Sequence, residues 1–372
     1  MHFKIDKIKL LNSLNIVSRA ISNYSPLPAF SGIKFDVSDN EICLTGSDSD
    51  ISIRTYLNQN EDNNLTIIKT GSIVIESKYI LDIIRKIDTD IIEIEVLDGC
   101  TTKICGGNSE YNIIGMYPND YPNLDFSKCE DEFKIESSKL KQIISQTLFA
   151  TSDKDNRPVL TGLNFVSKEH KLIVTGTDSY RLARKEIDVD NDLNFNITIP
   201  AKSLSEVMKS LDSSNEVLIG ISLKKVQFIF EDTLIQTRLI DGKYPDTDRL
   251  IPTEFKSELL LDVKDALGSI DRLSFIKNDG ISIIKLSLDN NECVLSSKSQ
   301  EIGYATEILK SGEYHGSTME ISFNGKYVFD SIKALNDSQI VFKFSGEMSA
   351  FIIVGKSDES SIQLVLPVRT YA

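Results

Sequence analysis

Three stretches of the chain share one pattern, a few alternating apolar positions followed by apolar positions at helical spacing. Their sequences are "HFKIDKIKLLNSLNIVSRA" (2–20), "EFKIESSKLKQIISQTLFA" (132–150) and "ELLLDVKDALGSIDRLSFI" (258–276). In each, an acidic residue suited to capping a helix separates the alternating part from the helical part. The pattern therefore predicts a strand followed by an amphipathic helix at three places, which is typical of an internal repeat.

A second predicted helix recurs at a fixed interval. Each copy is a strand, a two-residue break, a lysine and an amphipathic helix: "IVIESKYILDIIRKI" (73–87), "ITIPAKSLSEVMKSL" (197–211) and "ISFNGKYVFDSIKAL" (321–335). The lysines Lys78, Lys202 and Lys326 are 124 residues apart, which is one third of the 372-residue chain. Another apolar strand follows each helix. We therefore expect three equal units.

Each unit also contains a predicted hairpin. "GIKFDVSDNEICLTGSD" (32–48) and "GLNFVSKEHKLIVTGTD" (162–178) are equivalent, and "ISIIKLSLDNNECVLSS" (281–297) keeps the hairpin without the TG-x-D turn. With two helices and about eight short strands per unit, the predicted fold class is α+β with antiparallel sheets. Segments rich in Pro and Asp, near 117–128 and 244–254, mark the joints. The expected domains are 1–127, 128–252 and 253–372.

The distribution of charge suggests one kind of partner. The chain has 41% hydrophobic and 26% charged residues, which is ordinary for a globular protein. Its formal net charge is −14, yet the predicted helices together are positive, so the strands and loops are strongly acidic. Basic residues on the helices either keep the chain in solution or, if all helices face one side, form a basic lining that holds a polyanion loosely.

The N-terminus and the cysteines indicate the compartment. The start, "MHFKIDKIKLL", lacks the apolar core of a signal peptide, and no apolar stretch approaches the length of a membrane span. The five cysteines show no CxxC spacing. We therefore expect a cytoplasmic protein without a disulfide framework, and with no metal site and no cofactor.

Residue types that often carry out catalysis form no constellation in this sequence. The histidines fall in three different units: His2, His170 and His315. No phosphate-binding motif of the GxxxxGK[ST] or GxGxxG type is present. An enzyme with its site at Asp178, Arg181 and Arg184 is the alternative, but a hairpin turn alone explains both Asp178 and its equivalent Asp48. We therefore expect no enzymatic activity.

The second hairpin turn differs from the first in the residues that follow its Asp. "SYRLARKEI" (179–187) supplies an aromatic residue, two arginines and a leucine where the first copy has "SDISIRTYL" (49–57). Leu160, Leu182 and Leu366 are either core residues or, ringed by arginine at a domain boundary, the walls of a small groove for a hydrophobic peptide. The residues alone leave both interpretations open.

Five segments, distributed in order along the chain, resemble the bacterial DNA polymerase III beta subunit, the sliding clamp family. They are "RPVLTGLNF", "TGTDSYRLA", "DGKYPDTDRLIP", "FNGKYVFDSIKAL" and "LVLPVR". The resemblance implies the DNA clamp fold: three similar domains, each with two helices packed on antiparallel sheets, in a chain that closes head to tail with a second copy into a ring. Helices would line the hole around double-stranded DNA, which reconciles basic helices with an acidic chain. The implied function is that of a DNA polymerase processivity factor.

The resemblance also implies partners and site residues. A pocket between domains two and three would bind short hydrophobic motifs of the replicative polymerase alpha subunit, the clamp loader, other polymerases and repair proteins. The pocket residues would be Leu160, Thr177, Tyr180, Arg181, Leu182, Pro245, Arg249, Leu250, Tyr327, Ser349, Leu364, Val365, Leu366, Pro367, Val368 and Arg369. The DNA-binding residues would be Lys154, Arg157, Lys202, Lys78, Lys326 and Arg19. The homodimer interface would join Tyr111 and Ile113 of one chain to Leu273 of the other.

The chain departs from the family pattern at three places. "NYS" (23–25) stands where the family often has an Arg that touches DNA, so that contact is lost or moved to Arg19. Ser179 replaces the usual Gly and could narrow the pocket, and a tail, 370–372, extends far enough to occupy it. A protein-binding scaffold with the same fold that does not encircle DNA remains as a further alternative.

Overall fold

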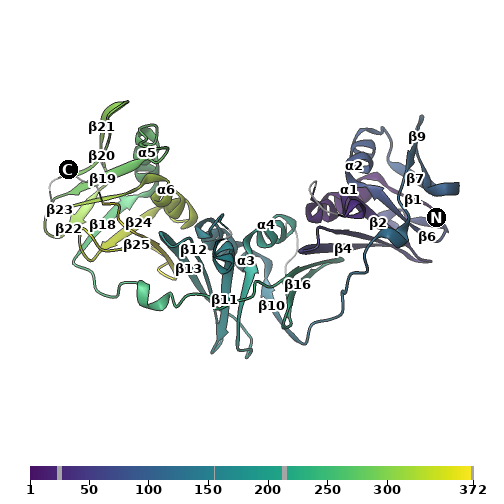
Figure 1. Cartoon of the computed structure of the whole chain (residues 1–372), viewed down its shortest axis with the longest axis horizontal. Helices are drawn as coiled ribbons and strands as arrows, with labels where there is room; N and C mark the ends of the chain where they lie inside the picture. The colour runs from purple at the N-terminus through teal and green to yellow at the C-terminus, as the bar shows by residue number, and fades with distance from the viewer. Residues whose placement is uncertain (23–26, 155, 212–215, 291, 370–372) are drawn as a thin grey trace. The chain divides into compact units, whose positions relative to one another are not determined.

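The computed structural model describes residues 1–372 except 23–26, 155, 212–215, 291 and 370–372. The chain forms two compact units, Met1–Ser137 with Ser203–Leu239, and Ser138–Lys202 with Ile240–Ala372 (Figure 1). The middle third of the chain therefore contributes elements to both units. Among the described residues, no helix combines the length and the apolar composition that crossing a membrane requires.

The first repeat contains both predicted helices, α1 (Lys7–Val17) and α2 (Ser77–Lys86). Its strands are β1 (His2–Asp6), β2 (Gly32–Val37), β3 (Glu41–Ser47), β4 (Ile51–Asn58), β5 (Thr66–Lys69), β6 (Gly71–Glu76), β7 (Ile91–Val96), β8 (Thr101–Gly106) and β9 (Ser109–Ile114). Asp6 caps α1, because its side chain accepts a hydrogen bond from the backbone N–H of Lys9 at 3.0 Å. Figure 1 shows α1 and α2 on the same side of β4.

The second repeat has the same order of elements. Its helices are α3 (Ser137–Thr147) and α4 (Ala201–Ser210). Its strands are β10 (Asp131–Glu136), β11 (Gly162–Lys168), β12 (Lys171–Thr177), β13 (Arg181–Asp188), β14 (Phe195–Pro200), β15 (Glu216–Ile221), β16 (Lys225–Phe230) and β17 (Thr233–Arg238). The predicted hairpin of 162–178 is the antiparallel pair β11–β12.

The third repeat again contains two helices, α5 (Val263–Leu273) and α6 (Gly325–Ala334). Its strands are β18 (Ser257–Asp262), β19 (Ile283–Leu288), β20 (Cys293–Ser299), β21 (Gly303–Ile308), β22 (Glu313–His315), β23 (Met319–Asn324), β24 (Gln339–Phe344), β25 (Phe351–Gly355) and β26 (Ser361–Val365). Asn324 caps α6 by accepting a hydrogen bond from the backbone N–H of Lys326 at 3.0 Å. The threefold repeat and the α+β class predicted from the sequence are thereby confirmed.

Each unit contains two antiparallel sheets. In the first unit the strand orders are β5-β1-β7-β8-β9 and β10-β15-β16-β17-β4-β3-β2-β6. In the second unit they are β14-β11-β12-β13-β26-β25-β24-β18-β22 and β21-β20-β19-β23. The longer sheet of each unit therefore joins strands from two successive repeats.

These joins use the same strand register. In the first unit, β4 pairs with β17 and places Thr55 opposite Thr233. In the second unit, β13 pairs with β26 and places Lys185 opposite Ser361. We call these pairs the first junction and the second junction. Because the hairpins β3–β4 and β12–β13 also match in register, Thr55 and Lys185 occupy equivalent positions.

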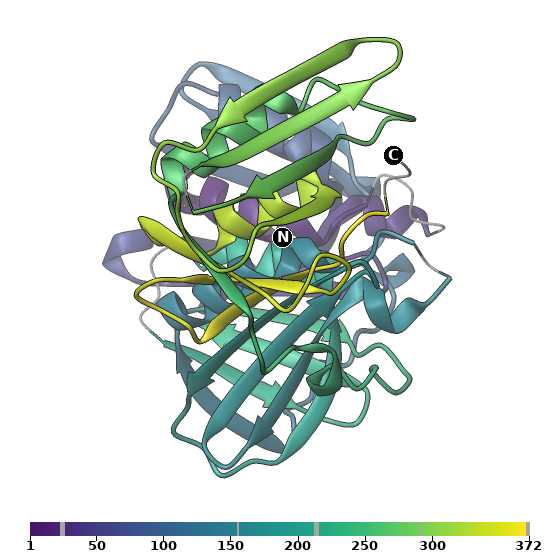
Figure 2. The ribbon, with the colours of Figure 1, turned by 90° about the vertical axis from the view of Figure 1, so that its left-hand side faces the viewer.

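The core of the third repeat contains residues from both of its sheets and both of its helices. The Phe351 ring packs against those of Phe344 and Phe342, with ring centres 5.5 and 6.1 Å away. Ile270 of α5 and Ile332 of α6 are buried in the same cluster. Figure 2 faces this repeat and shows the four-stranded sheet and the yellow strands of the nine-stranded sheet as separate layers. Burial of these apolar side chains fixes the helices on the sheets.

Candidate functional site

The turn between β12 and β13 is closed by hydrogen bonds from its own side chains. The Oδ1 atom of Asp178 accepts hydrogen bonds from the backbone N–H groups of Tyr180 (2.9 Å) and Arg181 (3.0 Å). The Thr177 hydroxyl donates to the backbone carbonyl of Arg181 at 2.6 Å. Ser179 has a φ of 79°, in the left-handed region that side chains other than Gly rarely adopt. Asp178 therefore has a structural role in the turn.

The turn between β3 and β4 has the same construction. The Oδ1 atom of Asp48 accepts hydrogen bonds from the backbone N–H groups of Asp50 (3.1 Å) and Ile51 (3.0 Å). The Ser47 hydroxyl donates to the backbone carbonyl of Ile51 at 3.0 Å, and Ser49 has a φ of 85°. Both Asp residues are therefore turn residues, as the sequence indicated.

The glycine of each TG-x-D turn lies against the end of the preceding helix. A Cβ atom at Gly46 would lie 2.7 Å from the backbone oxygen of Val17, the last residue of α1. A Cβ atom at Gly176 would lie 2.7 Å from the backbone oxygen of Thr147, the last residue of α3. Because real Cβ atoms do not approach backbone oxygens so closely, only glycine lets the hairpin pack on the helix end.

Arg181 is the residue at which the two turns differ most. Its Nε donates to Asp178 Oδ2 at 3.0 Å, and its Nη1 donates to Asp330 Oδ2 at 2.9 Å. Its guanidinium carbon lies 4.5 Å from the ring centre of Tyr327 and 5.2 Å from that of Phe149, within range of a cation–π interaction. The side chain is only 10% exposed. Burial raises the pKa of Tyr327, and the negative charge of Asp178 adds to the shift.

Asp330 and Phe149 are contacts of Arg181 that the sequence analysis missed. The repeat contained a signal for Asp330. It lies 124 residues after Glu206, which forms an ion pair with Arg19 at 3.6 Å within the first unit. An arginine and an acid from the second helix of the next repeat therefore meet in both units, although the arginines come from different elements.

The contacts of Asp178, Arg181 and Arg184 give no support to the enzymatic alternative. Both carboxylate oxygens of Asp178 already accept hydrogen bonds from Tyr180 and Arg181. Arg184 forms an ion pair with Asp248, which lies in the segment that connects β17 to β18. A general base needs an accessible oxygen next to a substrate proton, and the Asp178 oxygens are occupied by the turn.

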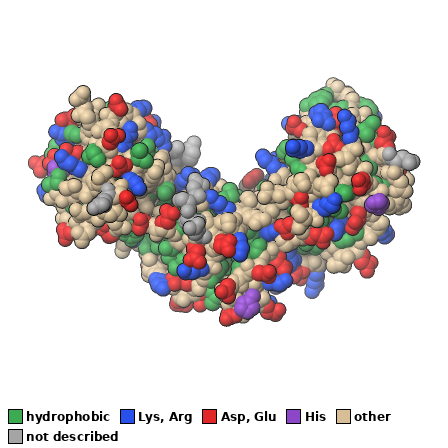
Figure 3. Space-filling view, turned by 180° about the vertical axis from the view of Figure 1, so that it is seen from behind, with side chains coloured by type: hydrophobic (Ala, Val, Ile, Leu, Met, Phe, Trp, Pro, Cys, Tyr) green, Lys and Arg blue, Asp and Glu red, His purple; other side chains and the backbone are tan. Residues whose placement is uncertain are grey.

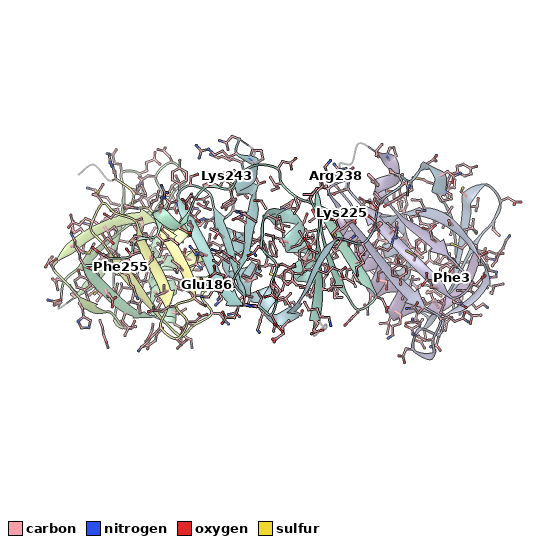
Figure 4. All side chains as sticks on the ribbon, turned by 90° about the horizontal axis from the view of Figure 1, so that it is seen from below. Phe3, Glu186, Lys225, Arg238, Lys243 and Phe255 are labelled. Carbon is pink, nitrogen blue, oxygen red and sulfur yellow. The ribbon has the colours of Figure 1, made fainter. Side chains whose placement is uncertain are left out.

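The predicted pocket residues divide into a buried and an exposed set. The buried residues are Leu160, Thr177, Leu182, Leu364 and Val365. Leu182 packs with Ile352, Val354 and Leu364 in a small cluster, and Phe255 of the connecting segment packs against it (Figure 4). Two of the three leucines whose role the sequence left open, Leu160 and Leu182, are therefore largely core residues.

The exposed set contains large apolar side chains. Tyr180, Leu250 and Leu366 are 62%, 54% and 39% exposed, and the backbone N–H of Leu366 donates to the carbonyl of Tyr180 at 3.0 Å. Met348, which the sequence analysis missed, is also exposed, beside Ser349 in the loop before β25. The remaining members are exposed or partly buried: Arg181, Pro245, Arg249, Tyr327, Ser349, Pro367, Val368 and Arg369. An apolar surface rimmed by arginines suits a hydrophobic peptide.

Known proteins resemble the chain along its entire length. Models of the N-terminal, central and C-terminal domains of the DNA polymerase III beta subunit match residues 1–125, 134–246 and 248–369. The beta sliding clamp of Bacillus subtilis is 38% identical over 379 residues that cover both chains completely. The chain belongs to the DNA polymerase III beta subunit family.

Solved structures of sliding clamps share the fold. The DNA polymerase sliding clamp of Bacillus subtilis is 37% identical, covers both chains completely and superposes with a TM-score of 0.94. The DNA polymerase III beta chain of Streptococcus pneumoniae is 32% identical, covers 99% of this chain and all of its own, and has a TM-score of 0.95. The chain therefore has three clamp domains and functions as a DNA polymerase processivity factor, as the sequence predicted.

The residues that the family resemblance assigned to DNA are mostly exposed. Lys78, Lys202 and Lys326 are each the second residue of a helix, at α2, α4 and α6. Lys326 also forms an ion pair with Asp330 at 3.0 Å. Lys154 and Arg157 are exposed, whereas the side chain of Arg19 is 33% exposed. Figure 3 shows basic and acidic side chains interspersed over the visible face of the molecule.

The residues assigned to the dimer interface differ in how much of each side chain is exposed. Tyr111 and Ile113 are partly buried on β9, an edge strand of the five-stranded sheet. Leu273 is 1% exposed within the core of the third repeat, so its side chain has no surface to offer a second chain. This assignment was wrong, because the last apolar position of the amphipathic helix α5 faces its own sheets. Phe275, two residues later, is 61% exposed.

The three departures from the family pattern have different outcomes. Residues 23–25 and the tail 370–372 lie outside the described residues. At Ser179, the φ of 79° explains why glycine suits this position, since glycine adopts left-handed backbone without a steric cost.

Proposed function

We propose that two copies of the chain close head to tail into a ring that encircles duplex DNA. The domains would be 1–127, 128–252 and 253–372. The ring would slide without catalysing a reaction and hold the replicative polymerase on DNA, in the cytoplasm. The exposed apolar surface described above would bind the polymerase alpha subunit, the clamp loader, other polymerases and repair proteins.

Strand pairing between repeats supports the ring. Each junction joins a strand near the middle of one repeat to the last strand of the next, in one register. Among the described strands, β21 of the third repeat and β9 of the first are the equivalents of the junction strands, and each lies at the edge of its sheet. Continuing the register would place Tyr111 opposite Ala305 of a second copy and Ile113 opposite Gly303. Such a pairing would bury both edges and close the assembly.

Exposed Phe275 supports the same interface. By repeat position it corresponds to Phe149, which lines a pocket together with Asp330 of the third repeat, and to Arg19, which contacts Glu206 of the second repeat. In both repeats this position therefore meets the repeat that follows. In the third repeat the following repeat would be the first repeat of a second chain, so Phe275 takes the place originally given to Leu273.

The positions of three lysines support DNA binding. Lys78, Lys202 and Lys326 project from the start of equivalent helices. Threefold repetition in a two-chain ring would present six such lysines, together with Lys154 and Arg157, to the phosphates. Contacts to phosphate without contacts to bases allow sliding, because they carry no sequence information.

Retention on DNA tests the ring. The protein would be loaded by its cognate loader onto nicked circular DNA, which would then be cut. Release on cutting is expected, because a ring slides off a free end. Retention after cutting would mean ordinary adhesion, and failure to load, with a loader shown to be active on another clamp, would favour the non-encircling scaffold.

A substitution on the exposed apolar surface tests partner binding separately. Leu366→Ala should weaken binding of a polymerase-derived hydrophobic peptide by about tenfold or more, as at other interface hot spots. Because Leu366 is exposed, unfolding stability should not change. Leu223→Ala is the matched control, since Leu223 is 96% exposed in the turn between β15 and β16. Equal peptide affinity of Leu366→Ala and the wild type in calorimetry would refute the assignment.

A further inference from the structure

The first unit contains a polar cavity that the proposed function does not use. It lies between the sheet strands β2, β3 and β4 and the connecting segment that follows β9, and has a volume of about 380 Å³. Its lining includes Lys34, Asp36, Thr45, Arg54, Asn119 and Tyr121. A volume above about 300 Å³ is in the range of small-ligand sites.

Comparison with the second repeat identifies an unusual feature of this cavity. Arg54 pairs with Thr45 across β3–β4 just as Arg184 pairs with Thr175 across β12–β13, so the two arginines are equivalent. Arg184 forms an ion pair with Asp248 of its connecting segment. Tyr121 is the equivalent of Tyr244, because each is followed by a proline and is buried, with a pKa that burial raises. This match aligns Asp248 with Asp125. The acid equivalent to Asp248 forms an ion pair with Lys225 at 3.2 Å and does not neutralise Arg54.

Tyr121 does not take over that role. Its ring packs edge-on against Phe30 with ring centres 5.3 Å apart, and its side chain is buried. Its hydroxyl lies 3.5 Å from the backbone oxygen of Thr45, to which it donates. Burial raises the pKa of this phenol, which keeps it neutral at physiological pH. It therefore supplies no negative charge to Arg54.

Arg54 has no carboxylate partner among the described residues. Its Nε donates weakly to the Thr45 hydroxyl at 3.4 Å, and its guanidinium carbon lies 3.7 Å from the ring centre of Phe126. The other two charges in the lining, Lys34 and Asp36, form an ion pair at 3.1 Å. The cavity therefore has one uncompensated positive charge, in a chain whose formal net charge is −14.

The wall that holds Arg54 is fixed in place. Lys225, labelled in Figure 4, belongs to β16. Its Nζ donates to the backbone oxygens of Asp125 and Ser127, both at 3.0 Å. Gln227 donates to the same Ser127 oxygen at 2.9 Å, and Gln236 donates to that of Asp125 at 3.1 Å. These bonds clamp the two residues on either side of Phe126, so its ring stays over the guanidinium. A site ordered before binding loses little entropy when a ligand arrives.

We propose that this cavity binds an oxyanion, the carboxylate or phosphate group of a small ligand, between Arg54 and Lys34. Arg54 would donate from both Nη atoms, because its Nε already donates to Thr45 and its guanidinium is held against the Phe126 ring. Lys34 would add a second charged donor. The oxyanion would take the place that Asp248 has at Arg184 in the second repeat. This inference does not depend on the ring or on the peptide surface.

Methyl NMR of the full-length protein, with Leu124 in the cavity lining as the reporter, tests the proposal. Malonate and inorganic phosphate would be titrated separately, against sodium chloride at equal ionic strength. We expect that either anion shifts the Leu124 methyl resonances saturably and that chloride does not. Whichever anion binds more tightly shows whether the natural ligand carries a carboxylate or a phosphate. Absence of a saturable shift with both anions would overturn the proposal.

Variants locate the binding within the chain. Arg54→Gln should weaken the affinity for the anion by about tenfold or more, because a bidentate charged contact is lost. Arg184→Gln, the repeat-matched control, should leave the affinity unchanged. Asn119→Asp adds a negative charge at an exposed lining position, so it should also weaken binding without disturbing packing. Wild-type affinity in both Arg54→Gln and Asn119→Asp would show that the anion binds elsewhere.

Discussion

At the first junction β4 pairs with β17, and at the second β13 pairs with β26, in the same register but with different side chains. At one equivalent position the first junction has Thr55, whose hydroxyl lies 3.1 Å from that of Thr233. The second has Lys185, whose Nζ donates to Asp358 at 2.6 Å and to the Ser360 hydroxyl at 2.7 Å. The backbone at the two junctions is thus nearly invariant, while the side chains differ in charge and size.

The comparison teaches where the function lies. Both hairpin turns are closed by an Asp and a hydroxyl in the same geometry, so the turn itself is scaffold. The second junction adds the exposed apolar residues Tyr180 and Leu366 beside it. The first junction has a polar cavity near the corresponding place. One fold therefore supports two different surfaces.

The largest expected difference between the junctions concerns Leu182 and its equivalent Ser52. Leu182→Ala should destabilise the protein by about 2–4 kcal/mol, because it leaves a cavity in the cluster with Ile352 and Leu364. Ser52→Ala should cost about 1 kcal/mol, since it removes only the 2.8 Å hydrogen bond to Ser47. Urea unfolding measures both. Equal costs would mean that Leu182 is not a core residue.

The next difference concerns Lys185 and Thr55. Lys185→Ala should cost about 2 kcal/mol, below the usual 3–5 kcal/mol for breaking a buried pair, because Asp358 remains partly exposed to water. Thr55→Ala should cost about 1 kcal/mol. Thermal unfolding of both variants at pH 7 provides the measurement, and a larger cost at Thr55 would contradict the comparison.

The pH dependence gives an independent test of the Lys185 pair. Burial opposes ionisation of Asp358, yet the hydrogen bonds from Lys185 and Ser360 hold its pKa below the usual value. A carboxyl whose pKa is lower in the folded than in the unfolded state stabilises the protein fully at pH values above its unfolded pKa of about 3.9. This stabilisation is lost as the pH falls through its folded pKa. The stability difference between wild type and Lys185→Ala should therefore shrink below about pH 4. A difference that stays constant down to pH 2 would contradict a charged pair.

A smaller effect is expected at the turn aspartates. Asp48→Ala and Asp178→Ala should each cost about 1 kcal/mol through loss of the turn hydrogen bonds. Asp178→Ala should cost somewhat more, because it also removes one of the two carboxylates that hold Arg181. Chemical denaturation measures the costs. Loss of an enzymatic activity with unchanged stability in Asp178→Ala would instead restore the enzymatic alternative.

The smallest effect is expected at the serines with left-handed backbone. Ser49→Gly and Ser179→Gly should each stabilise the protein by about 0.5 kcal/mol, since relief of a cost of about 1–2 kcal/mol exceeds the added chain entropy of glycine. The gain should be the same at both turns, because the φ angles are 85° and 79°. Calorimetric melting would check this, and a gain at only one turn would show that the turns are not equivalent.

The sequence by itself determined the repeat, the elements and the fold class. The interval of 124 residues, the alternating strands and the amphipathic helices are local patterns, so they can be recognised without knowing what packs against them. The helices predicted within 73–87 and 321–335 are α2 and α6, and each ends one residue before its predicted segment does. The role of Asp178 in its turn was also predictable, because all its backbone partners lie within three residues.

Only the tertiary structure decided which of these residues are accessible. Leu182 and Leu366 read alike in sequence, yet one is buried and the other exposed. Arg181 meets Asp330 across 149 positions, and Arg54 lacks an acid because Asp125 pairs with Lys225. Burial and charge pairing depend on contacts between distant segments, and a local pattern of polar and apolar residues does not encode which segments meet.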